Sequence, residues 1–102
     1  MIRPVRWSTE ALNDLANQLA YIAAENLRSA RRVAAAIDRV ALDLGNMPTG
    51  RPGRVVGTYE KSVTGLPYIV AYVLTKHDRV DVVAIARVIH TSRDWTAEEW
   101  PQ

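Results

Sequence analysis

The sequence predicts an α+β fold in the order β-α-α-β-β-β, an antiparallel sheet packed on an N-terminal helical hairpin. Two observations predict it. Apolar residues recur at helical spacing through residues 8–46, whereas residues 58–90 show the alternation of strands. The length of 102 residues suits one domain, 1–102, with a C-terminal tail at about 94–102.

The first expected element is a strand over residues 2–7, "IRPVRW", in which apolar and polar side chains alternate. Pro4 has no N–H to donate. We therefore expect this strand to lie at an edge of the sheet or to pair on one side only.

Two helices are expected next. The first carries an apolar stripe with steps of 3, 4 and 3, formed by Leu12, Leu15, Leu19 and Ile22. Ser8 or Thr9 is its expected N-cap, and Asn26 is its expected left-handed terminator. Ser29 is the expected cap of the second helix, and Gly45 with Asn46 is its stop signal. So short a link between the helices predicts an antiparallel hairpin.

Three strands complete the chain: "TYEKSV", "PYIVAYVL" and "RVDVVAIARVIH". The link "TKHD" between the last two predicts a hairpin turn, in which His77 is a solvated loop residue. Strands joined by such short turns must be antiparallel. Tyr68 and Tyr72 share a face with Val70 and Leu74, so we expect both rings to pack in the core.

Composition narrows the class of protein. The chain has no cysteine, which excludes disulfides and thiolate metal sites and favours the cytoplasm. Its longest apolar stretch, residues 68–74, is far shorter than the roughly 20 residues that span a bilayer. Arginine supplies 11 of the 13 basic residues. This bias suits an anionic or acidic partner, and a coding bias toward arginine would produce the same composition.

Residues 50–54 read "GRPGR", which places Arg51 and Arg54 on a frame of two glycines and a proline. The stretch is either a surface turn or a rigid cradle for a phosphate or carboxylate. It is neither a Walker loop nor a dinucleotide fingerprint, because the spacing and the following helix are absent. Its arginines are expected to reach toward the sheet end that carries Arg87 and His90.

Arg87 interrupts the last strand with a charge where an apolar residue is due. On a regular strand it shares a face with Val83, Ile85 and Ile89, and His90 lies on the other face. Arg87 is expected either to pair with a carboxylate, from the set Asp81, Asp94 and Glu60, or to clamp a phosphate at a cleft.

His90 ends this strand and is more often a structural residue than a general acid or base. The two histidines have no third ligand at a suitable spacing, so neither a metal nor a cofactor is expected. Arg93 and Trp95 follow. Trp95 is interpreted first as an anchor of the C-terminus, and otherwise as an interface or base-stacking residue.

Three motifs together, "GRPGR", "PYIVAY" and "RVIHTSRDW", resemble the RelE/ParE superfamily of toxins from bacterial type II toxin–antitoxin systems. The similarity runs over nearly the whole chain and is closer to the ParE-like branch. It implies a compact sheet with a helical hairpin on one side. It also implies a cytoplasmic toxin that forms a hetero-oligomer with a small antitoxin, ParD-like, with a ribbon-helix-helix or similar DNA-binding domain.

The resemblance implies two activities. RelE-like toxins cleave mRNA on the ribosome, and for that reaction Arg54 and Arg87 would face the scissile phosphate while His90 acts as acid or base. The chain departs from that pattern, because it has only two lysines and Thr91 follows His90. ParE-like toxins inhibit DNA gyrase by binding, and no catalytic site is needed for that.

The favoured hypothesis is a ParE-like gyrase inhibitor, which is not an enzyme. The alternatives are a RelE-like mRNA endonuclease and a non-toxic module that only binds its antitoxin. Many similar toxins have Arg-Glu-Leu where this chain has Tyr59-Glu60-Lys61, which exchanges a cation for an aromatic ring. The residues expected to contact the target or the antitoxin are Arg51, Arg54, Tyr59, Arg87, His90, Arg93 and Trp95.

Overall fold

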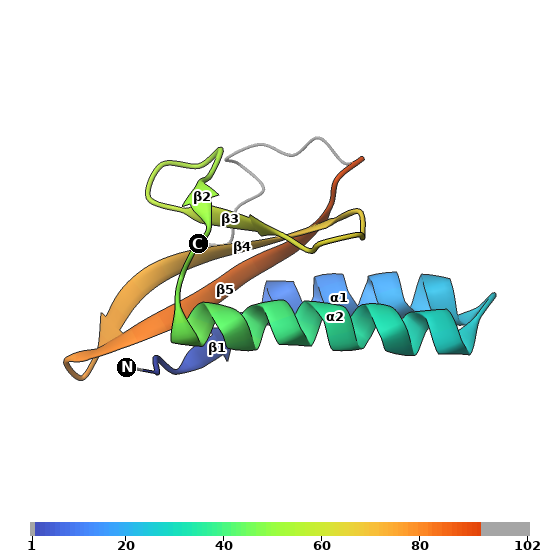
Figure 1. The fold of residues 1–102 in the computed structure, drawn as a ribbon, viewed down its shortest axis with the longest axis horizontal. Coiled ribbons are helices and arrows are strands. Elements are labelled where there is room, and N and C mark those ends of the chain that lie inside the picture. Colours follow the sequence, from blue (N-terminus) through green and yellow to red (C-terminus); the bar gives the residue numbers. More distant parts are fainter. Residues whose placement is uncertain (1, 93–102) are drawn as a thin grey trace.

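The computed structural model describes residues 2–92 and confirms the predicted α+β class. Its elements are β1 (Val5–Trp7), α1 (Thr9–Ala23), α2 (Leu27–Asn46), β2 (Arg51–Pro52), β3 (Tyr59–Ser62), β4 (Tyr68–His77) and β5 (Val80–His90). The two helices lie side by side under one face of the sheet (Figure 1). No helix among the described residues is long and apolar enough to cross a membrane.

The strands form one sheet in the order β1-β5-β4-β3-β2. Strands β3, β4 and β5 are antiparallel as predicted, and the short strand β2, which was not predicted, is antiparallel to β3. However, β1 runs parallel to β5, so the sheet is mixed. The prediction of antiparallel pairing rested on short turns, and no short turn joins β1 to β5. The first strand is also shorter than predicted. It lies at the sheet edge as Pro4 required, and the Pro4 carbonyl accepts a 2.9 Å hydrogen bond from the Val83 N–H.

The helix caps are partly as predicted. Ser8 is the N-cap of α1, where its hydroxyl oxygen accepts a 3.0 Å hydrogen bond from the Ala11 N–H. The predictions for Asn26 and Ser29 are wrong. Asn26 has an extended backbone and caps the start of α2, because its side chain accepts a 3.0 Å bond from the Ser29 N–H. Ser29 therefore lies in the first turn of α2 instead of ahead of it.

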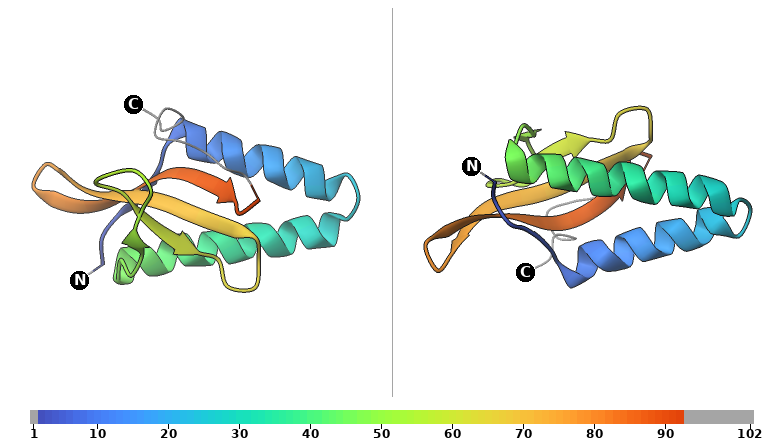
Figure 2. Two further views of the ribbon diagram at one scale, coloured as in Figure 1. Left: turned by 90° about the horizontal axis from the view of Figure 1, so that it is seen from above. Right: turned by 60° about the horizontal axis from the view of Figure 1, so that its bottom comes forward.

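The second helix ends at Asn46, where the stop signal of Gly45 with Asn46 was predicted, although Gly45 itself still lies inside α2 and is buried. A Cβ at this position would lie 2.8 Å from the carbonyl oxygen of Arg3 and 2.9 Å from Val5 Cγ2. The Arg3 N–H donates a 2.8 Å hydrogen bond to the Gly45 carbonyl. This glycine thus lets the N-terminal segment pass close beside the end of α2 (Figure 2).

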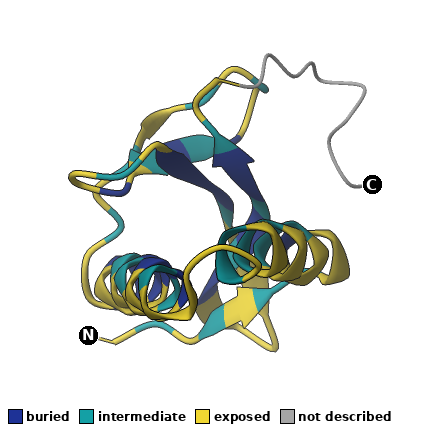
Figure 3. Ribbon diagram, turned by 90° about the vertical axis from the view of Figure 1, so that its right-hand side faces the viewer, coloured by how far each residue is buried: buried dark blue, intermediate teal, exposed yellow. Residues whose placement is uncertain are grey.

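The core lies between the helices and the facing side of the sheet (Figure 3). Its largest fully buried side chains are Tyr72, Ile37, Leu44, Ile85, Val70 and Val83. Tyr68 and Tyr72 are buried as predicted, whereas Leu74 is 45% exposed. Beyond Tyr72, β3 no longer pairs with β4, so Leu74 lies at an edge of the sheet.

The turn between β4 and β5 is tighter than predicted. Asp78 and Arg79 both have positive φ, at 50° and 68°, as a two-residue type I′ hairpin turn requires. His77 consequently ends β4 and pairs with Val80, and does not lie in the loop. Its side chain is exposed, in agreement with the predicted solvation.

Candidate functional site

A β-bulge in β5 decides which way the candidate residues face. Ala71 pairs with Arg87 and the next residue, Tyr72, pairs with Ile85, so Ala86 has no partner of its own on β4. One extra residue reverses the side-chain alternation beyond it. Val88 therefore joins the core on the helical face, and Arg87 does not share a face with Ile85 as a regular strand would require.

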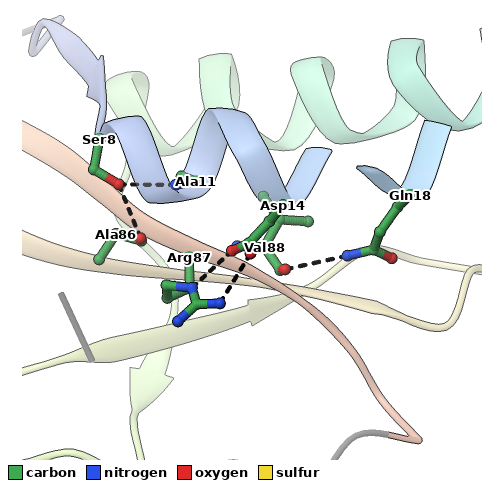
Figure 4. A network of polar contacts seen from close by, with 7 residues as sticks. All are labelled: Ser8, Ala11, Asp14, Gln18, Ala86, Arg87 and Val88. Atoms are coloured by element: carbon green, nitrogen blue, oxygen red, sulfur yellow. Dashed lines mark hydrogen bonds and ion pairs between the residues drawn. The ribbon is translucent and has the colours of Figure 1, made fainter. Parts of the chain in front are cut away.

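Arg87 forms an ion pair with Asp14 of α1 (Figure 4). Its Nε lies 2.8 Å from Asp14 Oδ2 and its Nη2 lies 2.9 Å from Asp14 Oδ1, so the contact is bidentate. Both side chains are largely buried, with 16% and 14% of their surface exposed.

The expected partners of Arg87 were wrong for the residues that the structure describes. Asp81 lies 4.0 Å from Lys76, and Glu60 pairs with Arg54. Asp94 lies outside the described residues. Asp14 was not among the partners that the sequence predicted.

Side chains of α1 and of its N-cap also complete the open edge of β5. The pairing with β1 ends at Trp7 and Ile85. Beyond this point, the Ser8 hydroxyl donates to the Ala86 carbonyl at 2.9 Å, and Asp14 Oδ2 accepts the Val88 N–H at 3.0 Å. The Gln18 amide donates to the Val88 carbonyl at 3.2 Å (Figure 4). A helix therefore provides hydrogen bonds that a neighbouring strand would otherwise supply.

His90 lies at the end of β5 against the ring of Tyr68, with centroids 5.3 Å apart and planes at 86°. Its Nδ1 accepts the Ser92 N–H at 3.1 Å and lies 2.6 Å from the Ser92 hydroxyl oxygen. In the neutral ring, the proton is therefore on Nε2. Burial raises the pKa of the Tyr68 phenol.

A cavity of about 420 Å³ lies between α1 and the ends of β4 and β5. Arg87 and His90 both line it, together with Asp14 and the amides of Asn17 and Gln18. The structure thus brings together two of the residues that the sequence singled out. The polar residues of α1 in this cavity were missed, although Asp14 and Gln18 are four residues apart and so share one side of the helix.

The "GRPGR" stretch folds as strand β2 and the start of the loop after it. Arg54 is fixed by Glu60, which accepts the Arg54 N–H at 2.8 Å and the guanidinium Nε and Nη2 at 3.1 and 3.3 Å. Burial by itself raises the pKa of Glu60. The hydrogen bonds and charge of Arg54, with a smaller effect of Arg51, bring that pKa below its ordinary value of 4.5.

Both glycines of this stretch permit close approach to a polar side chain. The Gly50 N–H donates a 2.7 Å hydrogen bond to the Tyr72 hydroxyl, and a Cβ on Gly50 would collide with that hydroxyl. A Cβ on Gly53 would lie 2.5 Å from Thr58 Oγ1 and 3.1 Å from Glu60 Oε2. The stretch is therefore a closely packed turn, and Arg54 stabilises it through its hydrogen bonds to Glu60.

Arg51 and Arg87 lie at the two ends of one row of paired residues across the sheet and do not contact each other. Arg51 pairs with Glu60, Glu60 with Ala71, and Ala71 with Arg87. Three strand spacings separate the ends of this row by about 14 Å. Tyr59 is half-buried and stacks on Tyr72 with centroids 5.6 Å apart, so its ring belongs to the core side of the sheet.

Arg93 and Trp95 lie outside the described residues. Within residues 2–92, no cluster of three or more histidine, aspartate or glutamate side chains is placed to hold a metal ion.

Several solved structures share this fold, including two from toxin–antitoxin systems. The chain superposes on a protein from the chromosomal ParDE toxin–antitoxin system of P. aeruginosa with a TM-score of 0.75 at 17% identity, covering 87% of this chain and 96% of the other. It superposes on a chain of the toxin–antitoxin complex RelBE2 from Mycobacterium tuberculosis with a TM-score of 0.62 at 27% identity, covering 88% and 99%. The fold is thus that of RelE/ParE superfamily toxins.

Sequence comparison narrows this class to one family. Residues 5–95 match the family described as the ParE toxin of the type II toxin–antitoxin system, parDE. The chain is also 34% identical over 92 residues to the candidate toxin Y4kP of Sinorhizobium fredii, covering 89% of this chain and 91% of that protein. The chain belongs to the ParE toxin family.

Proposed function

We propose that this ParE-family toxin arrests growth in the cytoplasm by binding DNA gyrase, without catalysing a reaction of its own, and that a cognate antitoxin neutralises it. The observation that carries the proposal is the state of the two arginines that a nuclease would need. Glu60 and Asp14 each engage one guanidinium through its Nε and Nη2.

Stabilising a phosphoryl-transfer transition state requires donors and positive charge directed at the reacting phosphate. Here a carboxylate offsets the charge of each arginine and occupies two of its donors. This arrangement supports a structural role for Arg54 and Arg87, and it leaves the surface of the toxin to act through binding.

The antitoxin part of the proposal is supported by the matched structures, which come from a ParDE system and from a RelBE2 toxin–antitoxin complex. A short reading frame next to the toxin gene, encoding a DNA-binding domain with a trailing segment, is the expected source of the partner. Co-expression of that frame should restore growth and yield a complex that co-purifies with the toxin.

A supercoiling assay tests the gyrase part. Purified toxin added to gyrase, ATP and relaxed plasmid should block supercoiling and increase gyrase-dependent DNA breaks. Relaxation of the supercoiled form of this plasmid by a type I topoisomerase, with the toxin present, is the control and should be unaffected. If supercoiling proceeds and breaks do not accumulate, gyrase is not the target.

One observation favours ribosome-dependent mRNA cleavage as a second candidate function, because Arg87 and His90 line the same cavity. Ser92 engages the Nδ1 of His90, so Nε2 is the ring nitrogen left to exchange a proton with a substrate. This function predicts that His90→Ala abolishes mRNA cleavage, detected by primer extension, and leaves antitoxin binding intact. Growth arrest with uncut transcripts excludes it, and unimpaired growth on induction indicates a module that only binds its antitoxin.

A further inference from the structure

The loop between β2 and β3 is longer than a minimal hairpin turn, and internal hydrogen bonds fix its conformation. Two residues suffice for a hairpin connection, whereas residues 53–58 form this one. The Gly53 N–H donates to the Thr58 carbonyl at 2.8 Å, and the Thr58 N–H donates to the Val55 carbonyl at 3.1 Å. The Thr58 hydroxyl donates to the same Val55 carbonyl. In Figure 1 the loop projects from the sheet on the side opposite the helices.

A buried carboxylate fixes the base of this loop. Glu60 is 5% exposed, and its hydrogen bonds hold both the backbone and the side chain of Arg54. Burying a carboxylate is costly unless hydrogen bonds and an opposite charge compensate for it. Behind the loop, Val55 packs on a small apolar cluster of Ile69, Ala71 and Ile89. The conformation of the loop is therefore set before any partner arrives.

Val56 occupies the tip of this rigid loop and is 100% exposed. Its side chain contributes no packing to the described fold, in contrast to Val55 beside it. A β-branched side chain has few rotamers to lose on binding, and a preformed loop has little backbone entropy to lose. Burial of Val56 by another molecule would therefore favour association at a small entropic cost.

The charge around the loop indicates the chemistry of its partner. Arg51 is exposed and forms no ion pair with a carboxylate among residues 2–92. Among the residues that the structure describes, Arg51, Arg54 and Glu60 at the base of the loop carry a net charge of 2 − 1 = +1. The complementary surface is an apolar pocket with a carboxylate at its rim, which is the chemistry of a protein.

We propose that loop 53–58 is the preformed element by which this toxin docks on gyrase. Val56 enters an apolar pocket of the enzyme, and Arg51 faces a carboxylate beside that pocket. The inference rests on the gyrase-binding function proposed above and assigns that function to a particular surface.

The test is the affinity of the purified toxin for immobilised gyrase. Val56→Ser and the nearly isosteric Val56→Thr should each raise Kd by roughly ten- to hundredfold, because full burial of one valine corresponds to that range. Val80→Ser is the matched control. Val80 is 50% exposed at the end of the other hairpin, and its substitution should change Kd less than about twofold. Arg51→Met should slow association, with an effect that shrinks as salt is raised.

The outcomes separate the two proposals. If the wild type binds gyrase and the Val56 variants bind as tightly as Val80→Ser, the loop assignment is overturned and the gyrase function stands. If the wild type neither binds nor inhibits gyrase, the proposed function fails and the assignment fails with it. Thermal melting of each variant checks the fold, and no change is expected for the two Val56 variants because Val56 is fully exposed.

Discussion

The ion pair between Asp14 and Arg87 yields the largest stability effect that we expect from a single polar residue. Asp14 accepts hydrogen bonds of 2.8, 2.9 and 3.0 Å, two from Arg87 and one from the Val88 N–H. Asp14→Ala removes all three. Breaking a buried ion pair costs about 3–5 kcal/mol, and a buried donor left unsatisfied costs about 1–3 kcal/mol.

The residual exposure of this pair, 16% and 14%, places the expected loss at the lower end, at about 3 kcal/mol. Asp14→Asn keeps one acceptor for the Val88 N–H or for Arg87, so about 2 kcal/mol is expected. For a domain of this size, 3 kcal/mol lowers Tm by roughly 12–24 °C.

Urea unfolding followed by far-UV circular dichroism measures these losses. Asp43→Ala is the matched control, because its ion pair with Arg39 lies within one helix and its side chains are 62% and 78% exposed. An exposed i,i+4 pair contributes about 0.3–0.5 kcal/mol. If Asp14→Ala and Asp43→Ala destabilise by the same amount, the ion pair does not fasten α1 to β5, and the reasoning is refuted.

Three further predictions concern the sheet. The Arg54 contacts lower the pKa of Glu60, so this group contributes stability above about pH 4.5 that is lost as the pH falls through the lowered pKa. In urea titrations at decreasing pH, Glu60→Gln should weaken the dependence of the free energy of unfolding on pH below about pH 4.5. An unchanged dependence on pH would contradict this. Gly50→Ala should cost about 1–3 kcal/mol in thermal melts through its collision with the Tyr72 hydroxyl, and less in a Tyr72→Phe background; equal costs in both would rule out the collision. Arg79→Gly should raise stability by about 0.5 kcal/mol by relieving the positive φ of 68°, and a loss would show that the turn is not strained.

Local patterns were sufficient to predict the elements and the burial of the two strand tyrosines. Apolar spacing identifies α1 and α2 within a few residues, because each pattern depends on one element alone. The failures depend on contacts between elements. The close passage of Arg3 beside Gly45 cannot be read from either segment alone, and nothing near Ala86 in the sequence signals a bulge.

The candidate site was predictable to the same degree. Arg87 and His90 stood out as polar residues in an apolar strand, and both line the cavity. Their neighbours on α1 did not stand out, since Asp14 and Gln18 belong to the polar side of an amphipathic helix in the sequence. Only the parallel edge strand β1, which ends at Trp7, leaves an edge of β5 for these side chains to complete.

The engagement of Arg54 and Arg87 by carboxylates changes how mutations in this toxin should be interpreted. Removing either arginine leaves a largely buried carboxylate without its bidentate partner, so stability falls together with any binding or catalytic role. Loss of toxicity in such a variant is therefore equally consistent with a structural and a functional role. Arg51 and Val56 are exposed and take no part in the core. Substitutions there change the surface with little effect on folding, so loss of toxicity at these two positions would report recognition directly.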